Sequence, residues 1–303
     1  MNTPHAFAHE PIEHASVDEL RGYLVANFAL VFVVVMAIGF LFERAATRME
    51  AELEFERGRS ERLLLNTLPA AIAQRLKDRP GEAIAERHAE VSVLFCDIVG
   101  FTRLSERLPP EELVALLNRV FTAFDDLADA HGVEKIKTIG DAYMVIAKES
   151  AAPLAQLALD MLSYVNTHDF GGSHLEFRIG INSGPVVAGI VGVKKYAYDI
   201  WGDTVNIAAR METTSDPGKV NISGATYHEI KPYFDCEYRG KLPVKNKGAI
   251  DMYYVHRIKP MFSVDAKGIE PNERFYEVLK FNSHSEISFN RASKFIMQKL
   301  KAE

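Results

Sequence analysis

The first part of the chain contains one long, uninterrupted apolar segment. Residues Tyr23 to Phe42 carry Asn27 as their single strongly polar side chain. A helix needs about 20 apolar residues to cross the ~30 Å hydrocarbon core of a bilayer, so residues 23–42 are predicted to form a transmembrane helix. The preceding residues are acidic and lack the basic n-region of a signal peptide. A core helix of a globular domain is the remaining alternative.

The charges that flank this segment predict its orientation. Only Arg21 lies shortly before it, whereas Arg44, Arg48, Arg57, Arg59 and Arg62 follow it. Lys and Arg mark the cytoplasmic side of a span. Residues 1–22 are therefore predicted to be a short extracytoplasmic N-terminus, and the rest of the chain is expected in the cytoplasm at the cell membrane.

Residues 43–88 are predicted to be a helical connector. Their first part is rich in Ala, Glu, Arg and Leu, which are good helix formers. The helix is expected to break near Pro69, where Thr67 is placed to cap a second helix. The apolar residues Leu65, Leu68, Ile72 and Leu76 lie near one face. A self-pairing coiled coil and a solvated surface helix both fit, because no run of clean heptads is present.

Residues 89–258 alternate between strand and helix patterns and are predicted to form the globular domain. Val91, Val93 and Phe95 belong to a buried strand, and a hairpin is expected around Ile139-Gly140-Asp141. Helices are predicted over 110–131, over 152–167 and within "GDTVNIAARMET", and a strand covers "EFRIGINSG". This order predicts an α+β fold, a sheet with helices on one face.

The tail, residues 259–303, carries a weaker pattern. Phe289, Ala292, Ile296 and Leu300 fit one face of a last helix. Packing on the domain is the default expectation, and contact with the membrane or with a partner are the alternatives.

Composition narrows the function classes. The chain has 303 residues, of which 48% are apolar and 25% charged, as expected for a folded chain rather than a disordered one. A net charge of −6 gives no basic face for nucleic acid. Cys96 and Cys236 cannot form a disulfide framework and are interpreted as reduced thiols. Cys96, beside Asp97, fits an inert strand cysteine better than a redox-sensitive one.

Two carboxylates are expected to meet at neighbouring strand ends. Asp97 ends the first buried strand, and Asp141 lies at the tip of the hairpin predicted beside it. Such a pair suits Mg²⁺ or Mn²⁺. The backbone amides of Gly100, Phe101 and Thr102 follow at a helix start, where they can hold phosphates. Together these features predict two-metal chemistry on a nucleoside triphosphate, although an aspartate at a strand end is also a common turn or cap residue.

Four segments, in order along the chain, carry a family resemblance. They read "VSVLFCDIVGFTRLSE", "VEKIKTIGDAYM", "FRIGINSGPVVAGIVG" and "YDIWGDTVNIAARME". This set resembles the catalytic domain of the class III adenylyl and guanylyl cyclases, over roughly Val91 to Val255. The resemblance implies a ferredoxin-like α+β domain that works as a head-to-tail homodimer. It also implies the conversion of ATP or GTP to the 3′,5′-cyclic monophosphate and pyrophosphate.

The resemblance assigns roles to individual residues. Asp97, Asp141 and the carbonyl of Ile98 match the ligands of two Mg²⁺ or Mn²⁺ ions per active site. Asn206 and Arg210 match the catalytic pair that orients the ribose and stabilises charge on the α-phosphate.

One further match concerns the terminal phosphates. Lys245 matches the lysine that holds them, although Asn246 stands where the family commonly has glycine, so Lys247 shares or takes this role as an alternative. Pro185 occupies the position of a phosphate-binding arginine found in some members, and that contact is absent here.

Two residues predict the choice of nucleotide. Adenine presents an acceptor at N1 and a donor at its 6-amino group, and guanine reverses both. Lysine can only donate and an ionised aspartate can only accept. Lys137 and Asp199 therefore fit adenine and mismatch guanine, and they stand where the family's adenylyl members carry lysine and aspartate. ATP is the predicted substrate.

Two alternatives remain beside a membrane-anchored adenylyl cyclase. One is a guanylyl or dual-specificity cyclase. The other is a catalytically silent cyclase-like signalling module, although silent members are expected to lack part of the metal or catalytic set. A membrane or cytosolic regulator is expected as a further partner, and the sequence does not identify it.

Overall fold

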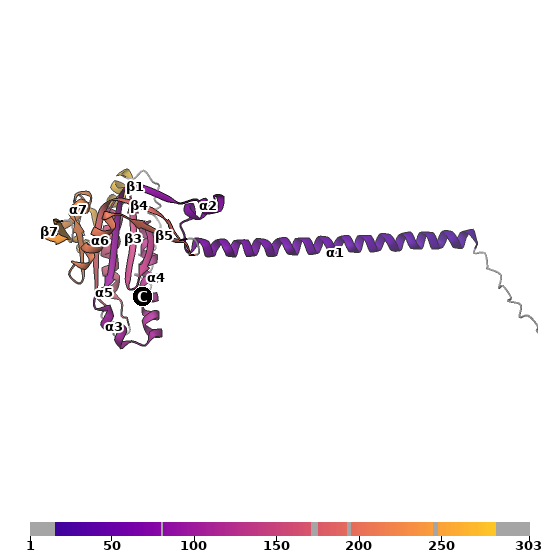
Figure 1. Cartoon of the computed structure of the whole chain (residues 1–303), viewed down its shortest axis with the longest axis horizontal. Coiled ribbons are helices and arrows are strands. Elements are labelled where there is room, and N and C mark those ends of the chain that lie inside the picture. The colour runs from indigo at the N-terminus through magenta and orange to yellow at the C-terminus, as the bar shows by residue number, and fades with distance from the viewer. Residues whose placement is uncertain (1–15, 80, 171–174, 193–194, 245–247, 283–303) are drawn as a thin grey trace, which may run out of the picture. The chain divides into compact units, whose positions relative to one another are not determined.

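A computed structural model describes residues 16–79, 81–170, 175–192, 195–244 and 248–282. By its internal contacts the chain divides into two units, Met1–Gln74 and Arg75–Glu303. The first unit is dominated by one continuous helix, α1 (Val17–Leu65) (Figure 1).

Among the described residues, α1 is the helix long and apolar enough to cross a membrane. Its apolar side chains are exposed, for example Phe28 at 69% and Phe42 at 76%. A core helix of the described domain would bury such side chains. The exposure therefore argues against that alternative, while the membrane itself is inferred from length and composition.

The break after α1 lies where the sequence predicts it, but its polar contact is different. α1 ends at Leu65 and α2 (Ala70–Asp78) follows Pro69. The hydroxyl of Thr67 donates to the carbonyl of Leu64 at 2.9 Å. The prediction that Thr67 caps the second helix is wrong, because α2 begins at Ala70 and Pro69, not Thr67, precedes its first turn.

The second unit contains an eight-stranded sheet with the order β2-β3-β1-β4-β6-β8-β7, to which β5 is added by pairing with β4. The strands are β1 (Ala85–Ile98), β2 (Glu134–Ile139), β3 (Ala142–Lys148), β4 (Phe177–Val191), β5 (Ala197–Trp201), β6 (Lys219–Ser223), β7 (Phe234–Val244) and β8 (Gly248–Ile258). The pairs are antiparallel except β4 with β6. The helices are α3 (Phe101–Arg107), α4 (Pro110–His131), α5 (Ala152–Thr167), α6 (Asp203–Thr213), α7 (Gly224–Ile230) and α8 (Glu273–Asn282).

Two hydrophobic clusters lie on the two faces of the sheet. The larger contains Leu94, Cys96 and Ile98 of β1 with residues of α4, α5, α7 and α8. The smaller contains Val93 and Phe95, the alternate residues of β1, with Ala208 of α6. Successive side chains of a strand point to opposite faces. Helices therefore cover both faces, and the prediction of helices on one face is wrong for α6.

The close approach of α6 to the sheet depends on a glycine. A Cβ built on Gly180 of β4 would lie 1.9 Å from the backbone nitrogen of Glu212. Any side chain at this position would push the helix away. The sequence shows the glycine, but it does not show which helix uses the space.

The chain continues past β8 with packed structure. A short 3₁₀ turn, Pro260–Phe262, and α8 follow. Phe275 of α8 is 1% exposed and makes edge contacts with Phe234 and Phe262. This part of the tail packs on the domain as expected, and the helix predicted around Phe289 to Leu300 lies outside the described residues.

Candidate active site

Asp97 and Asp141 are neighbours at one edge of the sheet. Asp97 is the next-to-last residue of β1, and Asp141 lies between β2 and β3. β1 pairs with β3 through Cys96 and Tyr143, which places the hairpin tip beside the end of β1. Burial raises the pKa of Asp141 to about 6, and a hydrogen bond to Asp97 and the charge of Asp97 add to this shift.

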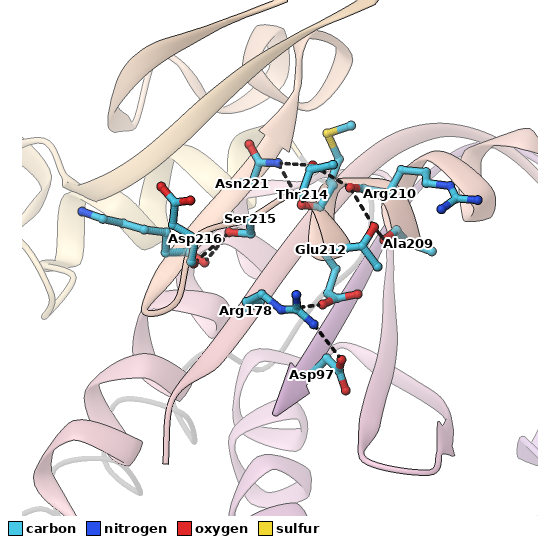
Figure 2. Close-up of polar contacts among 12 residues, drawn as sticks. Asp97, Arg178, Ala209, Arg210, Glu212, Thr214, Ser215, Asp216 and Asn221 are labelled. Carbon is cyan, nitrogen blue, oxygen red and sulfur yellow. Dashed lines mark hydrogen bonds and ion pairs between the residues drawn. The ribbon is translucent and has the colours of Figure 1, made fainter. Parts of the chain in front are cut away.

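Arg178 and Glu212 extend this carboxylate pair. The guanidinium Nη2 of Arg178 donates to Oδ2 of Asp97 at 3.2 Å, and its Nε lies 3.2 Å from Oε1 of Glu212 (Figure 2). The second distance is that of an ion pair, but these two buried atoms form no hydrogen bond. Burial raises the pKa of Glu212 to about 7, the charge of Asp97 adds to this, and Arg178 opposes it.

The carboxylates of Asp97 and Asp141 fit a divalent cation whose other ligands come from a bound substrate. The described residues contain no group of three or more His, Cys, Asp or Glu that could enclose a metal ion. Two adjacent carboxylates repel each other when both are charged, which raises a pKa, and a bound dication would relieve this repulsion. Mg²⁺ in particular is usually held by one or two carboxylates together with substrate phosphates. Asp97 and Asp141 therefore fit the metal that the sequence predicts.

The turn after β1 has the shape that the sequence predicts. Gly100 adopts a φ of 72°, and α3 begins at the next residue without a side-chain cap at its N-terminus. A φ in this range favours glycine. The amides of Phe101 and Thr102 thus open a helix next to Asp97, as the phosphate-holding hypothesis requires.

Lys137 and Asp199 meet although 62 positions separate them. Nζ of Lys137 lies 2.5 Å from Oδ2 of Asp199, and Oδ1 of Asp199 accepts from the amide of Ile200 at 2.9 Å. The register of β2 shifts between Lys135 and Lys137. An inserted residue at a bulge redirects the side chain beside it, and here the bulge allows Lys137 to reach β5. The two residues predicted to bind the base form one polar pair.

The N-terminus of α6 is fixed by contacts from β4. Oγ1 of Thr204 donates to the carbonyl of Pro185 at 2.7 Å, and Nδ2 of Asn182 donates to the carbonyl of Thr204 at 3.0 Å. Asn206 and Arg210 lie one turn apart on α6 and are both exposed. Strand β4 thus anchors the helix, and the two predicted catalytic side chains face away from the core.

Among the described residues, two pairs of predicted site residues lie together. Asp97 and Asp141 form one, and the ion pair Lys137–Asp199 forms another. The side chain of Arg210 extends away from the Asp97–Arg178 contact (Figure 2). Lys245 and Lys247 lie outside the described residues.

Sequence reasoning missed Arg178 and Glu212. A charged residue inside the apolar strand "FRIGI" was the available signal for the first. Glu212 gave none, because it follows Arg210 in a helix with many polar residues and is buried only through the approach at Gly180. Cys96 is fully buried, and burial raises the pKa of its thiol well above the usual value, as for an inert strand cysteine.

This fold, with paired carboxylates at the end of β1 and an exposed Asn and Arg on α6, is that of a nucleotide cyclase catalytic domain. The sequence model of the adenylate and guanylate cyclase catalytic domain matches residues 83–257. The chain belongs to this family.

Curated relatives include both kinds of cyclase. The chain is 43% identical over 219 residues to an adenylate cyclase of Mycobacterium tuberculosis, which covers 70% of this chain and 49% of the relative. It is 39% identical over 217 residues to guanylyl cyclase C of Sus scrofa, covering 67% of this chain and 20% of the relative. The chain thus spans about half or less of the length of these relatives.

Solved structures agree with the fold. The catalytic core of a rhodopsin-guanylyl cyclase with converted specificity, in complex with ATPαS, has a TM-score of 0.55 at 38% identity, covering 56% of this chain and 97% of that chain. The adenylyl cyclase CyaB from P. aeruginosa has a TM-score of 0.53 at 31% identity, covering 57% of this chain and 95% of that chain.

Proposed function

We propose that this protein is a membrane-anchored adenylyl cyclase that converts ATP to 3′,5′-cyclic AMP and pyrophosphate. The Lys137–Asp199 pair carries the choice of ATP, because it offers one fixed donor and one fixed acceptor at 2.5 Å. Its partners on a base must be an acceptor beside a donor, and adenine meets this when its N1 faces Lys137 and its 6-amino group faces Asp199, as the family resemblance implies. The similarity to an adenylate cyclase at 43% identity supports the same choice.

Each predicted residue has a task in this reaction. Asp97, Asp141 and the Ile98 carbonyl would hold Mg²⁺ or Mn²⁺, which when bound promotes loss of the proton of the ribose 3′-hydroxyl and neutralises phosphate charge. The amides of residues 100–102 and Lys245 bind the phosphates. Asn206 orients the ribose, so that its 3′-oxygen faces the α-phosphorus. The planar, permanently charged guanidinium of Arg210 stabilises the charge that develops on the α-phosphate.

The active form is proposed to be a homodimer with two shared sites. One chain supplies the metal-binding carboxylates of a site, and its partner supplies Lys137, Asp199, Asn206, Arg210 and Lys245. The direction of Arg210 supports this, because its side chain extends away from Asp97 of the same chain (Figure 2). A two-fold axis then gives two equivalent sites.

Mixed dimers test both the reaction and the shared site. Asp97→Ala and Arg210→Ala are each expected to be nearly inactive alone. In the mixed dimer, one site inherits both lesions and the other is intact. With random pairing, half of the dimers are mixed, so about a quarter of wild-type cyclic AMP formation should return. If demonstrated mixed dimers stay inactive, the shared site is wrong.

A guanylyl or dual-specificity cyclase is the second candidate, favoured by the similarity to guanylyl cyclase C. The relative rates with ATP and GTP separate the two. A silent signalling module would form neither cyclic nucleotide.

Residues 23–42 are proposed to anchor the enzyme, with the catalytic domain in the cytoplasm. The exposed apolar length of α1 and the arginines after it support this placement. A membrane or cytosolic regulator remains the proposed source of the activating signal.

A further inference from the structure

Arg178 joins two carboxylates that belong to different parts of the domain. Asp97 is its cross-strand partner on β1, and Glu212 lies on α6, two residues after Arg210. The guanidinium lies between them, with 3.2 Å to each carboxylate (Figure 2). The side chain of Glu212 is only 8% exposed, so this contact lies inside the domain.

The contact between Arg178 and Glu212 is a buried ion pair without a hydrogen bond. Nε of Arg178 and Oε1 of Glu212 are buried and close, yet they form no hydrogen bond. A buried ion pair is weak evidence of stabilisation, and one with an unmade hydrogen bond is weaker still. What the arrangement does achieve is a fixed orientation of the Asp97 carboxylate relative to α6.

Further contacts show that α6 is held where Glu212 lies. The backbone at Glu212 rests directly on Gly180, two residues along β4 from Arg178. Nδ2 of Asn221 donates to the carbonyl of Met211 at 2.8 Å, and the Thr214 hydroxyl donates to the carbonyl of Arg210 at 2.7 Å (Figure 2). A change at Glu212 thus acts on the turn of α6 that carries Arg210.

If the proposed function holds, Asp97 and Arg210 of one chain serve different active sites. In the shared-site dimer, Asp97 of one chain belongs to one site and Arg210 of the same chain belongs to the other. The path Asp97–Arg178–Glu212–Arg210 lies within one chain. It therefore connects the metal side of one site to the catalytic arginine of the second.

We propose that Arg178 and Glu212 are positioning residues that couple the two active sites of the dimer. Glu212 holds the Arg178 guanidinium, which in turn orients Asp97 for the metal, and the same contact fixes α6 for Arg210. The claim that the two active sites are coupled rests on the proposed function. The claim that Arg178 and Glu212 orient Asp97 for the metal concerns a single chain and is tested by metal binding, without turnover.

The first test measures Mn²⁺ binding without nucleotide in the full-length protein. Glu212→Gln keeps the size of the side chain but removes the charge that faces Arg178. The guanidinium then has Asp97 as its remaining carboxylate and competes with the cation for it. Loss of an outer partner of a metal ligand typically weakens metal binding 10- to 100-fold, and about ten-fold weaker Mn²⁺ binding is expected here.

Asp235→Asn is the matched control. Asp235 forms an ion pair with Arg257 at 2.9 Å on the exposed surface of β7 and β8. The substitution Asp235→Asn should leave Mn²⁺ binding unchanged. Thermal unfolding and the dimer mass of both variants show whether the fold is retained. If Glu212→Gln lowers thermal stability but the folded protein binds Mn²⁺ as wild type does, the role is structural and the proposal is overturned.

The second test places Glu212→Gln in one chain of the mixed dimer described above. Placed in the Arg210→Ala chain, which supplies the intact Asp97, Glu212→Gln should raise the Mn²⁺ concentration needed for half-maximal activity about ten-fold. Placed in the Asp97→Ala chain, which supplies the intact Arg210, Glu212→Gln should lower kcat at saturating Mn²⁺ and leave the Mn²⁺ requirement unchanged. An effect from one placement alone overturns the coupling between sites.

The two tests separate this inference from the proposed function. An inactive mixed dimer without Glu212→Gln contradicts the shared site, whereas the Mn²⁺ titration still reports on Asp97. Unaltered Mn²⁺ binding in folded Glu212→Gln contradicts the positioning role, even in an active cyclase.

Discussion

The Lys137–Asp199 pair is proposed to select ATP by one hydrogen-bond donor and one acceptor. The double substitution Lys137→Glu and Asp199→Cys exchanges donor and acceptor and should shift the preference from ATP toward GTP. Each hydrogen bond to a charged group contributes about 1.5–3 kcal/mol, so two mismatches disfavour guanine by about 3–6 kcal/mol. This corresponds to a preference for ATP of roughly a hundred- to ten-thousand-fold in kcat/KM.

The ion pair between Lys137 and Asp199 reduces this preference only slightly. Lys137 and Asp199 are 37% and 20% exposed, and pairs with such exposure contribute about 0–1 kcal/mol. Lys137→Glu alone is expected to be worse than the double substitution, because it places two carboxylates together where the structure has an ion pair. The single variant should therefore lose activity with both nucleotides, and Asp199→Cys should restore part of it.

The assay is the initial rate of cyclic AMP and cyclic GMP formation over a range of each nucleotide, with Mn²⁺. The double variant should lower the ATP-to-GTP ratio of kcat/KM at least about a hundred-fold. If both activities are lost, competition of ATP and GTP for a bound fluorescent nucleotide gives the ratio of their binding affinities, which should shift toward GTP in the same direction. An unchanged ratio in a folded dimer refutes the base-reading role.

Three further predictions concern metal, packing and membrane. In metal-free protein the raised pKa of Asp141 means that the folded state holds a proton which the unfolded state has lost, so thermal stability should fall as pH rises from about 4 through about 6. Asp141→Asn should reduce this fall and leave the part that comes from Glu212, whose pKa is raised to about 7, and an identical pH profile would contradict the assignment. Gly180→Ala adds a Cβ that would meet the backbone of α6, so it should destabilise the domain by about 1–3 kcal/mol or more in urea unfolding. Gly224→Ala should be tolerated, because the nearest atom to its Cβ lies at 3.6 Å, and equal effects of the two variants would refute the packing argument. Membranes should retain the protein after a high-salt wash, and protease added to intact cells should spare the catalytic domain, whereas release by salt alone would contradict the spanning helix.

Local patterns were sufficient for elements with strong end signals. The helix predicted over 110–131 is confirmed as α4, which has proline and acidic residues in its first turn and Gly132 with a φ of 64° at its end. The helix predicted over 152–167 is confirmed as α5, and the hairpin around Asp141 is confirmed as β2 and β3. In each case the residues that decide the structure lie within the element itself.

Tertiary contacts account for what the sequence did not reveal. α6 lies on its face of the sheet because Gly180, distant in sequence, leaves room for the helix. Lys137 reaches Asp199 because of a bulge that no residue pattern marks. Arg178 and Glu212 become neighbours only after β4 and α6 have packed, so neither could be assigned to the site from its own surroundings in the sequence.

The most direct measurement is nucleotide turnover by the purified 303-residue chain. With Mn²⁺, ATP should yield cyclic AMP and pyrophosphate in equal amounts, GTP should react far more slowly, and EDTA should abolish the reaction. Asp97→Ala should remove turnover while the domain stays folded. Undiminished turnover in Asp97→Ala, or faster formation of cyclic GMP than of cyclic AMP by the wild type, would contradict the account.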